Sequence, residues 1–447
     1  MEQRTSRAHK VIFSRNQLSI GDYFWVDFCH NKGIIFSVCN FFHEARNNQM
    51  TRLDSTLLKA EQSGDLSVDE IEFLLSLSEQ TDLDRLFAAA YAVKERFVGK
   101  KAWFRGIVEF SNICSKDCYY CGIRRSNSKT SRFLIPEEDI IKSAVWAWEA
   151  EYGSAVLQSG ERSDPQFVDM VERIIKEIKR RTNGELGLTL SLGEQTEETY
   201  RRWFEAGAHR YLLRIETSNR ELYSQLHPAD HNFDERLACL DRLRRAGFQV
   251  GTGVMIGLPM QTLRHLAEDV LFFKKQDVDM IGMGPYIYHN ETPLVKYREE
   301  WEIPTGKLLN LGLKMIAVTR LVLRDVNIAS TTALQALQDN GRELGLKAGA
   351  NIIMPNTTDT QYRESYQLYE NKPCLDENAS MCRGCLQRRI EAIGETIGFG
   401  EWGDSQHFAQ RHKSKQEANH EAENSADSSV SARALSTFSG KSPDGRR

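Results

Sequence analysis

The sequence predicts an α/β protein folded as a (β/α)8 TIM-type barrel, with a helical N-terminal lead-in and disordered tails. Three observations support this fold class. Eight short apolar runs alternate with long amphipathic patterns, acidic or polar residues precede the amphipathic stretches, and glycines follow several of them. Strands that alternate with helices are typical of parallel sheets, and eight strands favour a closed barrel over an open doubly wound sheet.

The predicted elements follow one another in a regular order. Strands are expected at residues 103–112, 154–160, 186–193, 210–217, 249–258, 280–287, 327–332 and 351–355. Helices are expected between them at residues 136–152, 165–182, 196–206, 233–246, 262–275, 305–323 and 333–346. Pro136-Glu-Glu-Asp and Thr196-Glu-Glu-Thr are typical helix starts, whereas Gly153, Gly207 and Gly247 are typical helix ends. In such a barrel the active site lies at the C-terminal ends of the strands.

The two ends of the chain differ in composition from its middle. Residues 1–50 are irregular and rich in aromatic side chains, and we expect a poorly ordered extension or an over-long translation start. Residues 51–100 have the apolar spacing of helices, and the barrel is expected at 101–360. A C-terminal segment at 361–405 leads towards a tail, residues 413–447, whose lack of an apolar pattern predicts disorder.

Composition and charge narrow the class of protein. The chain has 447 residues, of which 40% are hydrophobic and 27% are charged, as in an ordinary globular protein. The net charge of −4 gives no sign of a nucleic-acid-binding surface, so we expect no nucleic acid partner. No apolar run approaches the ~20 residues of a membrane span, and no secretory signal is recognisable. We therefore expect a cytoplasmic protein without a membrane partner.

Three cysteines lie within one short run, Cys114-Ser-Lys-Asp-Cys118-Tyr-Tyr-Cys121, directly after the first predicted strand. Three thiolates at the spacing C-x3-C-x2-C can bind three irons of a 4Fe-4S cluster and leave the fourth iron open to a small molecule. The usual occupant at this spacing is S-adenosylmethionine (SAM), which such a site cleaves reductively to a 5′-deoxyadenosyl radical. Structural zinc needs a fourth ligand, and the next histidine is distant, at His209. A disulfide framework is disfavoured because the cysteine usage fits a reducing compartment.

Several predicted strands carry polar residues where a barrel interior is usually apolar. Arg214 and Glu216 are two residues apart on one strand, so they share a face and are expected to point into the barrel as a pair that binds a ligand. A simple interior ion pair is the alternative. Other polar or small residues lie on strands or at their ends: Gln158, Gly160, Thr189, Ser191, Gly251, Gly253, Tyr286, Tyr288, Thr331 and Thr332. Together they predict a polar pocket, in which the glycines give a cofactor room to approach.

The chain from about residue 51 to 402 resembles the biotin synthase-like radical-SAM enzymes, and within them the HydE family of FeFe-hydrogenase maturases. The motifs that carry the resemblance are Cys-Ser-Lys-Asp-Cys-Tyr-Tyr-Cys-Gly-Ile-Arg at 114–124, Gln-Ser-Gly-Glu at 158–161, Tyr-Leu-Leu-Arg-Ile-Glu-Thr-Ser-Asn at 211–219, Gly-Leu-Pro at 257–259, Asp-Met-Ile-Gly-Met-Gly-Pro at 279–285 and Ala-Ser-Thr-Thr-Ala-Leu at 329–334. The resemblance implies a (β/α)8 barrel in which SAM binds the open iron through its amino and carboxylate groups. One departure is Met260, which stands where the family commonly has glycine.

The resemblance also implies roles for individual residues. Cys114, Cys118 and Cys121 would bind the 4Fe-4S cluster on which catalysis depends. The cofactor-binding residues would be Tyr120, near the adenine, and, in contact with SAM, Arg214, Glu216, Arg236 and Met280. The substrate cavity would be lined by Gln158, Thr189, Tyr286, Thr331 and Thr332, of which Thr189 is the most specific.

The family helps to build the organometallic two-iron subcluster of the hydrogenase active site, the H-cluster. Its members would receive an iron–carbonyl–cyanide–cysteine synthon from the sister maturase HydG, and the radical would attack the sulfur of this substrate. The product would pass to the scaffold GTPase HydF. The resemblance therefore implies a small organometallic or amino-acid-derived substrate, HydG and HydF as partners, and a reductant such as ferredoxin or flavodoxin.

Three alternative functions stay open to different degrees. Biotin synthase uses a second, sacrificial cluster bound by cysteines on interior strands, and the strands predicted here carry no such cysteines. A methylornithine synthase-like amino-acid mutase shares the barrel and much of its polar lining, so it is the leading alternative. A carrier of Fe-S clusters without catalytic activity is disfavoured by the interior charged pair.

A second group of cysteines, Cys374-x7-Cys382-x2-Cys385, follows the last predicted strand. Three cysteines suggest a second Fe-S cluster with an open site, and a zinc knuckle is the alternative. The triad resembles the accessory-cluster site of some HydE family members and is not part of the usual methylornithine synthase pattern. We therefore interpret it as an accessory site. Cys239 lies in a predicted amphipathic helix and is expected to be structural.

Overall fold

The computed structural model describes residues 50–370, 372–373 and 379–414, without the side chains of residues 381 and 382. The chain divides into two units, Met1–Arg52 and Leu53–Arg447, and the fold given below is that of the second unit. The expected N-terminal extension up to residue 49, Cys374 and the tail beyond residue 414 lie outside the described residues. Residues 406–414 are helical, and the disorder expected in the tail at 413–447 stays a prediction.

A parallel sheet forms the centre of the fold. Its strands are β1 (Lys101–Ser111), β2 (Ser154–Ser159), β3 (Gly187–Ser191), β4 (Arg210–Leu212), β5 (Gln249–Thr252), β7 (Met280–Ile281), β9 (Asn327–Ile328) and β10 (Ile352–Ile353). They are hydrogen-bonded in the order β10-β1-β2-β3-β4-β5-β7-β9. The two ends of this order also meet, because Ser330 donates its N–H to the carbonyl of Ile352 over 2.8 Å and Asn351 donates to the carbonyl of Ile328 over 2.9 Å. The predicted closed (β/α)8 barrel is confirmed.

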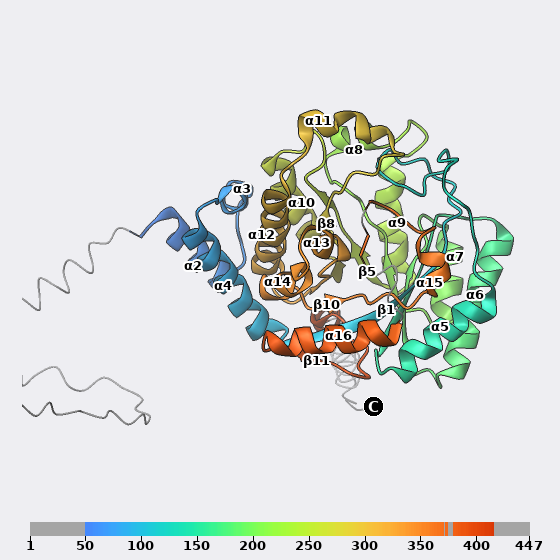
Figure 1. Cartoon of the computed structure of the whole chain (residues 1–447). Coiled ribbons are helices and arrows are strands. Elements are labelled where there is room, and N and C mark those ends of the chain that lie inside the picture. Colours follow the sequence, from blue (N-terminus) through green and yellow to red (C-terminus); the bar gives the residue numbers. More distant parts are fainter. Residues whose placement is uncertain (1–49, 371, 374–378, 415–447) are drawn as a thin grey trace, which may run out of the picture. The chain divides into compact units, whose positions relative to one another are not determined.

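Helices surround these strands. The main ones are α5 (Glu137–Glu149), α6 (Pro165–Arg181), α7 (Glu197–Glu205), α9 (Phe233–Arg245), α10 (Leu263–Lys275), α12 (Thr305–Leu323), α13 (Thr332–Leu337) and α14 (Gly341–Lys347). Figure 1 shows α5, α6 and α7 on one side of the barrel and α10, α12 and α14 on the other. Shorter helices that the sequence did not predict lie in the loops: α8 (Arg220–Leu226), η1 (Pro293–Tyr297), α11 (Arg298–Trp301) and α15 (Thr360–Arg363).

The predicted helical lead-in consists of α2 (Arg52–Gln62), α3 (Val68–Ser76) and α4 (Gln80–Phe97). α3 begins with a capping box, in which Ser67 and Glu70 each accept the other's backbone N–H. α3 packs on α10 and α12, and α4 packs on α12. The buried ammonium group of Lys314, on α12, donates to the carbonyl of Leu77 over 2.9 Å at the end of α3. These contacts fix the lead-in on the barrel.

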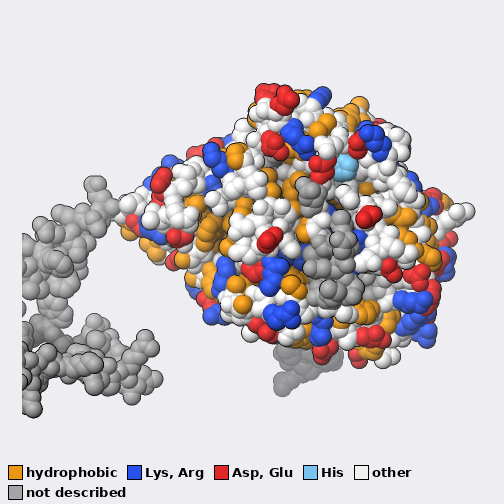
Figure 2. Space-filling view, in the orientation of Figure 1, with side chains coloured by type: hydrophobic (Ala, Val, Ile, Leu, Met, Phe, Trp, Pro, Cys, Tyr) orange, Lys and Arg blue, Asp and Glu red, His pale blue; other side chains and the backbone are white. Residues whose placement is uncertain are grey.

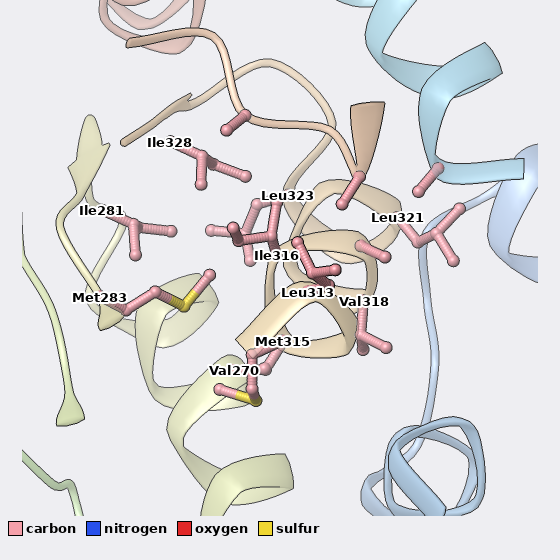
Figure 3. Close-up of a cluster of buried hydrophobic side chains, with 14 of the residues drawn as sticks. Val270, Ile281, Met283, Leu313, Met315, Ile316, Val318, Leu321, Leu323 and Ile328 are labelled. Atoms are coloured by element: carbon pink, nitrogen blue, oxygen red, sulfur yellow. The ribbon is translucent and has the colours of Figure 1, made fainter. Parts of the chain in front are cut away.

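One apolar core lies between the barrel strands and the helices α10 and α12 (Figure 3). Val270 of α10 and Met315 and Ile316 of α12 meet Ile281 of β7 and Ile328 of β9 in this cluster. α12 is buried along most of its length because the lead-in covers the side that faces away from the barrel. This double burial explains why α12 reads as an almost continuous apolar segment.

The strand expected to carry Arg214 and Glu216 is shorter than predicted. β4 ends at Leu212, and beyond it the hydroxyl of Thr252 takes the place of a backbone partner by accepting from the N–H of Ile215 over 3.2 Å. Glu216 then adopts a left-handed backbone conformation, with a φ of 68°. The two charged residues therefore do not share the face of a regular strand, although their side chains still meet.

The strands expected at 249–258 and 280–287 each break in the middle. The second halves are β6 (Met255–Ile256) and β8 (Gly284–Pro285), which pair with each other. At the break, Gly253 lies so close to the next strand that an added Cβ would stand 2.0 Å from the carbonyl oxygen of Gly282. Close approach of two backbones, rather than room for a cofactor, thus explains the glycine at position 253.

The helix expected at 333–346 is interrupted and forms α13 and α14. Gly341 begins α14, and an added Cβ there would stand 2.1 Å from the carbonyl oxygen of Leu334 in α13. The two short helices therefore cross at close range. A single straight helix cannot make this contact, so the chain leaves the helical conformation at residues 338–340.

The C-terminal segment closes the end of the barrel where the strands begin. After α16 (Ala379–Ala392), β11 (Thr396–Ile397) pairs with the start of β1. A fully buried ion pair of 2.7 Å between Lys94 and Glu395 attaches the segment to α4. The carbonyl of Trp402 then accepts from the hydroxyl of Ser154, the first residue of β2, over 2.8 Å. The beginnings of the strands are thus occupied by the chain itself.

The surface carries acidic and basic side chains interspersed over the face seen in Figure 2. Ion pairs join neighbouring helices, as between Arg173 and Arg181 of α6 and Glu137 and Glu138 of α5, each over 2.7 Å. Within the described part of the chain, no helix combines the length and the apolar character that a membrane span requires.

Candidate active site

The three predicted cluster cysteines lie in the loop that follows β1, at the end of the barrel where the strands end. The N–H of Cys121 donates to the carbonyl of Cys118 over 3.3 Å, so the last turn of this loop is compact. Burial raises the pKa of Cys118 to about 12, and it also raises the pKa of Cys114 and of Cys121. Neighbouring thiols raise the pKa of Cys118 and Cys121 further, which requires the three sulfur atoms to lie near one another.

The end of β2 supports the first cysteine. Glu161 donates its backbone N–H to the sulfur of Cys114 over 3.3 Å and accepts the N–H of Ser115 over 2.8 Å. Gly160 lies against the same loop, where an added Cβ would stand 2.5 Å from the carbonyl oxygen of Ile113. The glycine of the Gln-Ser-Gly-Glu motif therefore makes room for the cysteine loop.

Two buried histidines hold the middle of the cysteine loop. The Nδ1 of His227 donates to the carbonyl of Tyr223 over 2.8 Å, because a carbonyl can only accept, and its Nε2 therefore accepts from the hydroxyl of Tyr120 over 3.2 Å. His231 accepts the backbone N–H of Asp117 at Nε2 over 3.1 Å. Burial lowers the pKa of His227 to about 3, which keeps its ring neutral. Tyr120, predicted near the adenine, is thus fixed beside the cysteines.

The three cysteines suit a 4Fe-4S cluster better than a single metal ion. Among the residues that the structure describes, no three His, Cys, Asp or Glu side chains converge on one metal position. In a cluster each thiolate binds a different iron, so the sulfur atoms need not converge on one point. Coordination also deprotonates a thiol outright, which offsets the raised pKa values of these buried groups. The donor set therefore fits the predicted cluster.

The predicted SAM residues form a network of buried and half-buried charges beside the cysteine loop. Arg214 and Glu216 lie 3.0 Å apart, measured from Nη2 to Oε2. Arg236 donates from Nη1 to the carbonyl of Arg214 over 2.9 Å and pairs through Nε with Glu194. Lys116, which belongs to the cysteine loop, pairs with the same Glu194 over 2.7 Å. The structure thus brings Arg214, Glu216 and Arg236 together and connects them to the cysteine loop.

Some polar atoms at the ends of the strands are buried without a well-directed hydrogen bond to any described residue. They are Oε2 of Glu216, Nε of Arg214 and Oγ1 of Thr331. Burial raises the pKa of Glu216, and the charges of Arg214 and Arg236 lower it. Unsatisfied buried polar atoms are costly and are rare in native structures unless a ligand or water completes them. Oε2 of Glu216 still has Arg214 as its ion-pair partner, whereas Nε of Arg214 and Oγ1 of Thr331 fit contacts to a polar cofactor or substrate.

A second polar group lies inside the mouth of the barrel. Gln158 donates from Nε2 to the hydroxyl of Tyr366 over 3.3 Å. Burial raises the pKa of Tyr366, and the charge of Glu109 and the first and third cysteine thiols raise it further, so the phenol lies near the cysteines. Lys372 donates to both carboxylate oxygens of Glu109, over 2.5 and 2.6 Å. Gln158, predicted to contact substrate, is therefore part of a larger buried network.

Two predicted site residues make contacts elsewhere. Met280 is the first residue of β7, and its sulfur accepts from Arg105 over 2.7 Å, while Arg105 also donates to the carbonyl of Gly403 over 2.9 Å. Thr189 accepts at its hydroxyl from Nε of Arg210, the first residue of β4, over 3.0 Å. These contacts do not test the predicted contact of Met280 with SAM, which stays a prediction. The role of Thr189 stays a prediction.

The remaining predicted substrate residues lie past the ends of the strands. Tyr286 follows β8, and its ring centre lies 4.9 Å from that of Tyr288. Both tyrosines line a cavity of about 320 Å³, together with Arg298. Thr332 begins α13, and its hydroxyl forms a hydrogen bond of 2.8 Å with the hydroxyl of Tyr369. Contact of these side chains with a substrate stays a prediction.

The second cysteine group is only partly described. Cys385 is a half-buried free thiol in α16. Cys382 lies in the same helix, and only its backbone is described. Cys374 lies outside the described residues. A second Fe-S cluster or a zinc ion at this triad therefore stays a prediction.

Lys116 and Glu161 lie within the quoted motifs, but the sequence predicted no role for them or for Glu194, His227 and His231, which all support the cysteine loop. Glu161 follows the end of β2 and Glu194 follows the end of β3. Polar residues just past strand ends are typical of a barrel active site, so this position was a signal for both glutamates. The two histidines follow α8 without any characteristic spacing, so the sequence offered no signal for them.

Comparisons with known proteins agree with this geometry. The family model described as the Radical SAM superfamily matches residues 108–273. The chain is 43% identical over 330 residues to the FeFe-hydrogenase maturase subunit HydE of Thermotoga maritima, which covers 74% of this chain and 91% of that protein. It is 25% identical over 331 residues to 3-methylornithine synthase of Methanosarcina acetivorans, over 74% of this chain and 89% of that protein. A solved structure of methylornithine synthase aligns with a TM-score of 0.66 and 23% identity, over 77% of this chain and 98% of that one, which shows a shared fold.

The similarity to HydE extends over most of both chains, well beyond the cysteine motif. The residues matched by the Radical SAM family model, 108–273, include the three cysteines, Arg214, Glu216 and Arg236. Membership of the radical SAM superfamily implies a 4Fe-4S cluster and SAM as cofactors. The chain therefore belongs to the HydE family of FeFe-hydrogenase maturases and is a radical SAM enzyme.

Proposed function

We propose that this maturase acts in assembly of the diiron subcluster of the hydrogenase H-cluster, and that its 5′-deoxyadenosyl radical attacks a sulfur atom of the substrate. The observation that carries the enzymatic part is the ion pair of the half-buried Arg214 with the buried Glu216, beside three cysteines, in which Nε of Arg214 has no hydrogen-bond partner among the described residues. Such atoms are expected where a small molecule completes the site. A protein that only carries clusters has no need for them.

The three cysteines and the predicted SAM residues each have a defined task in this proposal. Cys114, Cys118 and Cys121 hold the 4Fe-4S cluster, which supplies the electron for reductive cleavage of SAM. The carboxylate of Glu216 suits a hydroxyl or ammonium group of SAM, and the guanidinium of Arg214 suits its carboxylate. Arg236 and Tyr120 complete this set, Arg236 by holding the backbone of Arg214.

The substrate is proposed to be a small organometallic or amino-acid-derived molecule, such as an iron–carbonyl–cyanide–cysteine synthon. Hydroxyl and amide groups are suitable donors to carbonyl and cyanide ligands. The residues proposed to supply them are Gln158, Thr189, Tyr286, Thr331 and Thr332. Among them, Thr331 has a buried hydroxyl without a partner in the described structure, which makes it the strongest candidate.

The proposed reaction needs a source of substrate, an acceptor of the product and a reductant. The substrate would come from HydG and the product would pass to HydF, as the membership of the HydE family supports. Reductive cleavage of SAM needs an external electron, which we propose comes from a ferredoxin or flavodoxin. The triad Cys374, Cys382 and Cys385 is proposed to hold an accessory cluster that this cleavage does not require.

The test is to reduce the reconstituted enzyme in the presence of SAM and to measure 5′-deoxyadenosine. Cys118→Ser is expected to abolish its formation, whereas Cys382→Ser is expected to leave it largely intact. An intact cluster that forms no 5′-deoxyadenosine would exclude the radical mechanism. Loss of SAM cleavage in Cys382→Ser would instead show that the second cysteine group is part of the catalytic site.

Sulfur chemistry is tested separately, with a sulfur-containing substrate such as an iron–cysteine complex. A thioether between the 5′-carbon of the deoxyadenosyl group and the substrate's sulfur, formed as one of that sulfur's bonds to carbon breaks and leaves the unpaired electron on the released carbon, supports the proposed attack. Rearrangement of an amino acid without such an adduct would support the mutase alternative.

A further inference from the structure

Glu216 holds a backbone conformation that is rare for any residue except glycine. Its φ of 68° lies in the left-handed region. Its side chain is only 11% exposed and lies against Arg214. Strain of this kind persists only where the surrounding structure determines the conformation firmly. The contacts around residue 216 therefore decide whether its carboxylate stays beside Arg214.

The chain is held both at Glu216 and just after it. The N–H of Glu216 donates to the carbonyl of Gly253, and its carbonyl accepts from the N–H of Met255, each over 3.0 Å. Two residues further on, the N–H and the hydroxyl of Ser218 both donate to Oδ1 of Asp269, each over 2.6 Å. The first two bonds come from the neighbouring β5–β6 segment, whereas the last two come from α10.

Packing alone does not explain Asp269. The other buried residues of α10 are Leu266, Ala267, Val270 and Phe273, all apolar. Asp269 lies among them with no exposed surface, and its Oδ2 has no hydrogen-bond partner in the described part of the chain. A carboxyl group in such surroundings is less favourable than an apolar side chain of similar volume. Its two hydrogen bonds to Ser218 are what distinguish it from an apolar residue at this position.

We propose that Asp269 is a positioning residue of the cofactor site, which fixes the turn at Ser218 and thereby holds the carboxylate of Glu216 in place for SAM. The inference rests on the proposed role of Glu216 in SAM binding. Asp269 acts from the helix side of the turn and not through contact with SAM. Its removal leaves the side chain of Glu216 chemically intact but lets the strained backbone relax, so SAM affinity falls.

The test measures SAM binding to the reconstituted enzyme, as a dissociation constant and as the change that SAM causes in the EPR spectrum of the reduced cluster. Asp269→Leu removes the acceptor, keeps the number and branching of the side-chain heavy atoms, and is expected to weaken SAM binding about tenfold. Asp269→Asn keeps an oxygen that accepts from Ser218 and is expected to bind SAM within about threefold of the unmodified enzyme. This rescue by the conservative variant distinguishes hydrogen bonding from packing.

Two further variants make the result specific. Val270→Ala is the matched control, because Val270 is the next buried residue of α10 and lies in the apolar core (Figure 3). It lowers stability by leaving a cavity and is expected to keep the SAM affinity unchanged. Glu216→Gln, which leaves the turn intact, is expected to weaken SAM binding at least as much as Asp269→Leu does.

The outcomes separate the inference from the proposed function. Normal SAM binding by Asp269→Leu, with weak binding by Glu216→Gln, overturns the positioning role alone. Normal binding by Glu216→Gln overturns the proposed role of Glu216, and the positioning role with it. If Asp269→Leu does not fold, Ser218→Ala decides: removal of the hydroxyl donor is expected to weaken SAM binding about threefold, and an unchanged affinity overturns the inference.

Discussion

The backbone N–H of Glu161 donates to the sulfur of Cys114 over 3.3 Å. This bond joins the end of β2 to the first cysteine after β1. This hydrogen bond requires a glycine at position 160, because a Cβ added to Gly160 would stand 2.8 Å from the Cβ of Cys114. An N–H that donates to a metal-bound sulfur stabilises its negative charge and orients it. The position of the β2 end is therefore coupled to cluster binding.

Gly160→Ala is expected to impair the cluster. The added methyl group displaces the loop at Cys114, because the atoms that it meets are backbone and Cβ atoms that cannot move aside alone. We expect the reconstituted variant to hold little iron and sulfide and to lose most SAM cleavage, measured as 5′-deoxyadenosine. Gly306→Ala, in α12, is the matched control, since no atom lies within 4 Å of an added Cβ there. A Gly160→Ala protein with a full complement of iron contradicts this account.

Lys372 and Glu109 form a buried ion pair, with side chains that are 7% and 4% exposed. Lys372→Met leaves the charge of Glu109 buried without its partner, which typically costs about 3–5 kcal/mol. We expect the free energy of unfolding, measured by urea denaturation, to fall by about this amount. Glu109→Gln in the same way leaves the ammonium group of Lys372 unpaired.

The double variant Lys372→Met with Glu109→Gln removes both charges and is expected to recover a large part of this loss. The difference between the double variant and the sum of the single variants is the coupling energy of the pair. If the two losses simply add, the side chains do not act as a pair, and the network around Tyr366 is not organised by them.

The order of helices and strands could be predicted from the sequence because periodicity reports which face of each element is buried. The boundaries that failed depend on contacts with distant residues. β4 ends early because Thr252, from the next strand, supplies a hydroxyl in place of a backbone carbonyl. The β5–β6 break depends on the approach of Gly253 to Gly282. Neither contact leaves a local pattern in the sequence.

The candidate site was predictable where residues share a motif or a strand. The cysteines are close in sequence, and Arg214 lies two residues before Glu216, so the sequence alone related them. Tyr120 and His227 are 107 residues apart, and Lys372 and Glu109 are 263 apart, so no spacing could indicate these pairs. These are long-range contacts that only the folded chain creates.

His407 is expected to make stability depend on pH in the alkaline range. Its Nδ1 lies 3.1 Å from a carboxylate oxygen of Asp325 and its Nε2 lies 2.6 Å from one of Asp277. The hydrogen bond to Asp325, with that to Asp277, raises the pKa of His407 to about 9 from 6.5. A raised pKa means that the stabilisation is fully present below about pH 6.5 and is lost as the pH rises through about 9.

His407→Gln removes the charge that the two carboxylates stabilise. We therefore expect the unfolding free energies of the two proteins to differ by roughly 2–3 kcal/mol more at about pH 6 than at about pH 9. Urea denaturation at both pH values measures this difference. A difference that stays constant with pH would show that folding does not raise the pKa of His407.

The buried carboxyl group of Asp269 is expected to make the protein less stable as the pH rises, which is the opposite of the pH dependence expected from an ion-paired surface carboxylate. Burial, with a smaller effect of the charge of Glu268, raises the pKa of Asp269 from 3.8 to about 7, although the bonds from Ser218 lower it. Because the folded-state pKa is raised, the contribution of this group to stability is present below about pH 4 and is lost as the pH rises through about 7. Asp269→Asn cannot ionise, so from about pH 5 to about pH 8 the unmodified protein should lose roughly 2–3 kcal/mol more of its unfolding free energy than the variant does. Parallel pH profiles in urea denaturation would show that the carboxyl group is not buried as described, and would also weaken the case for its hold on the Glu216 turn.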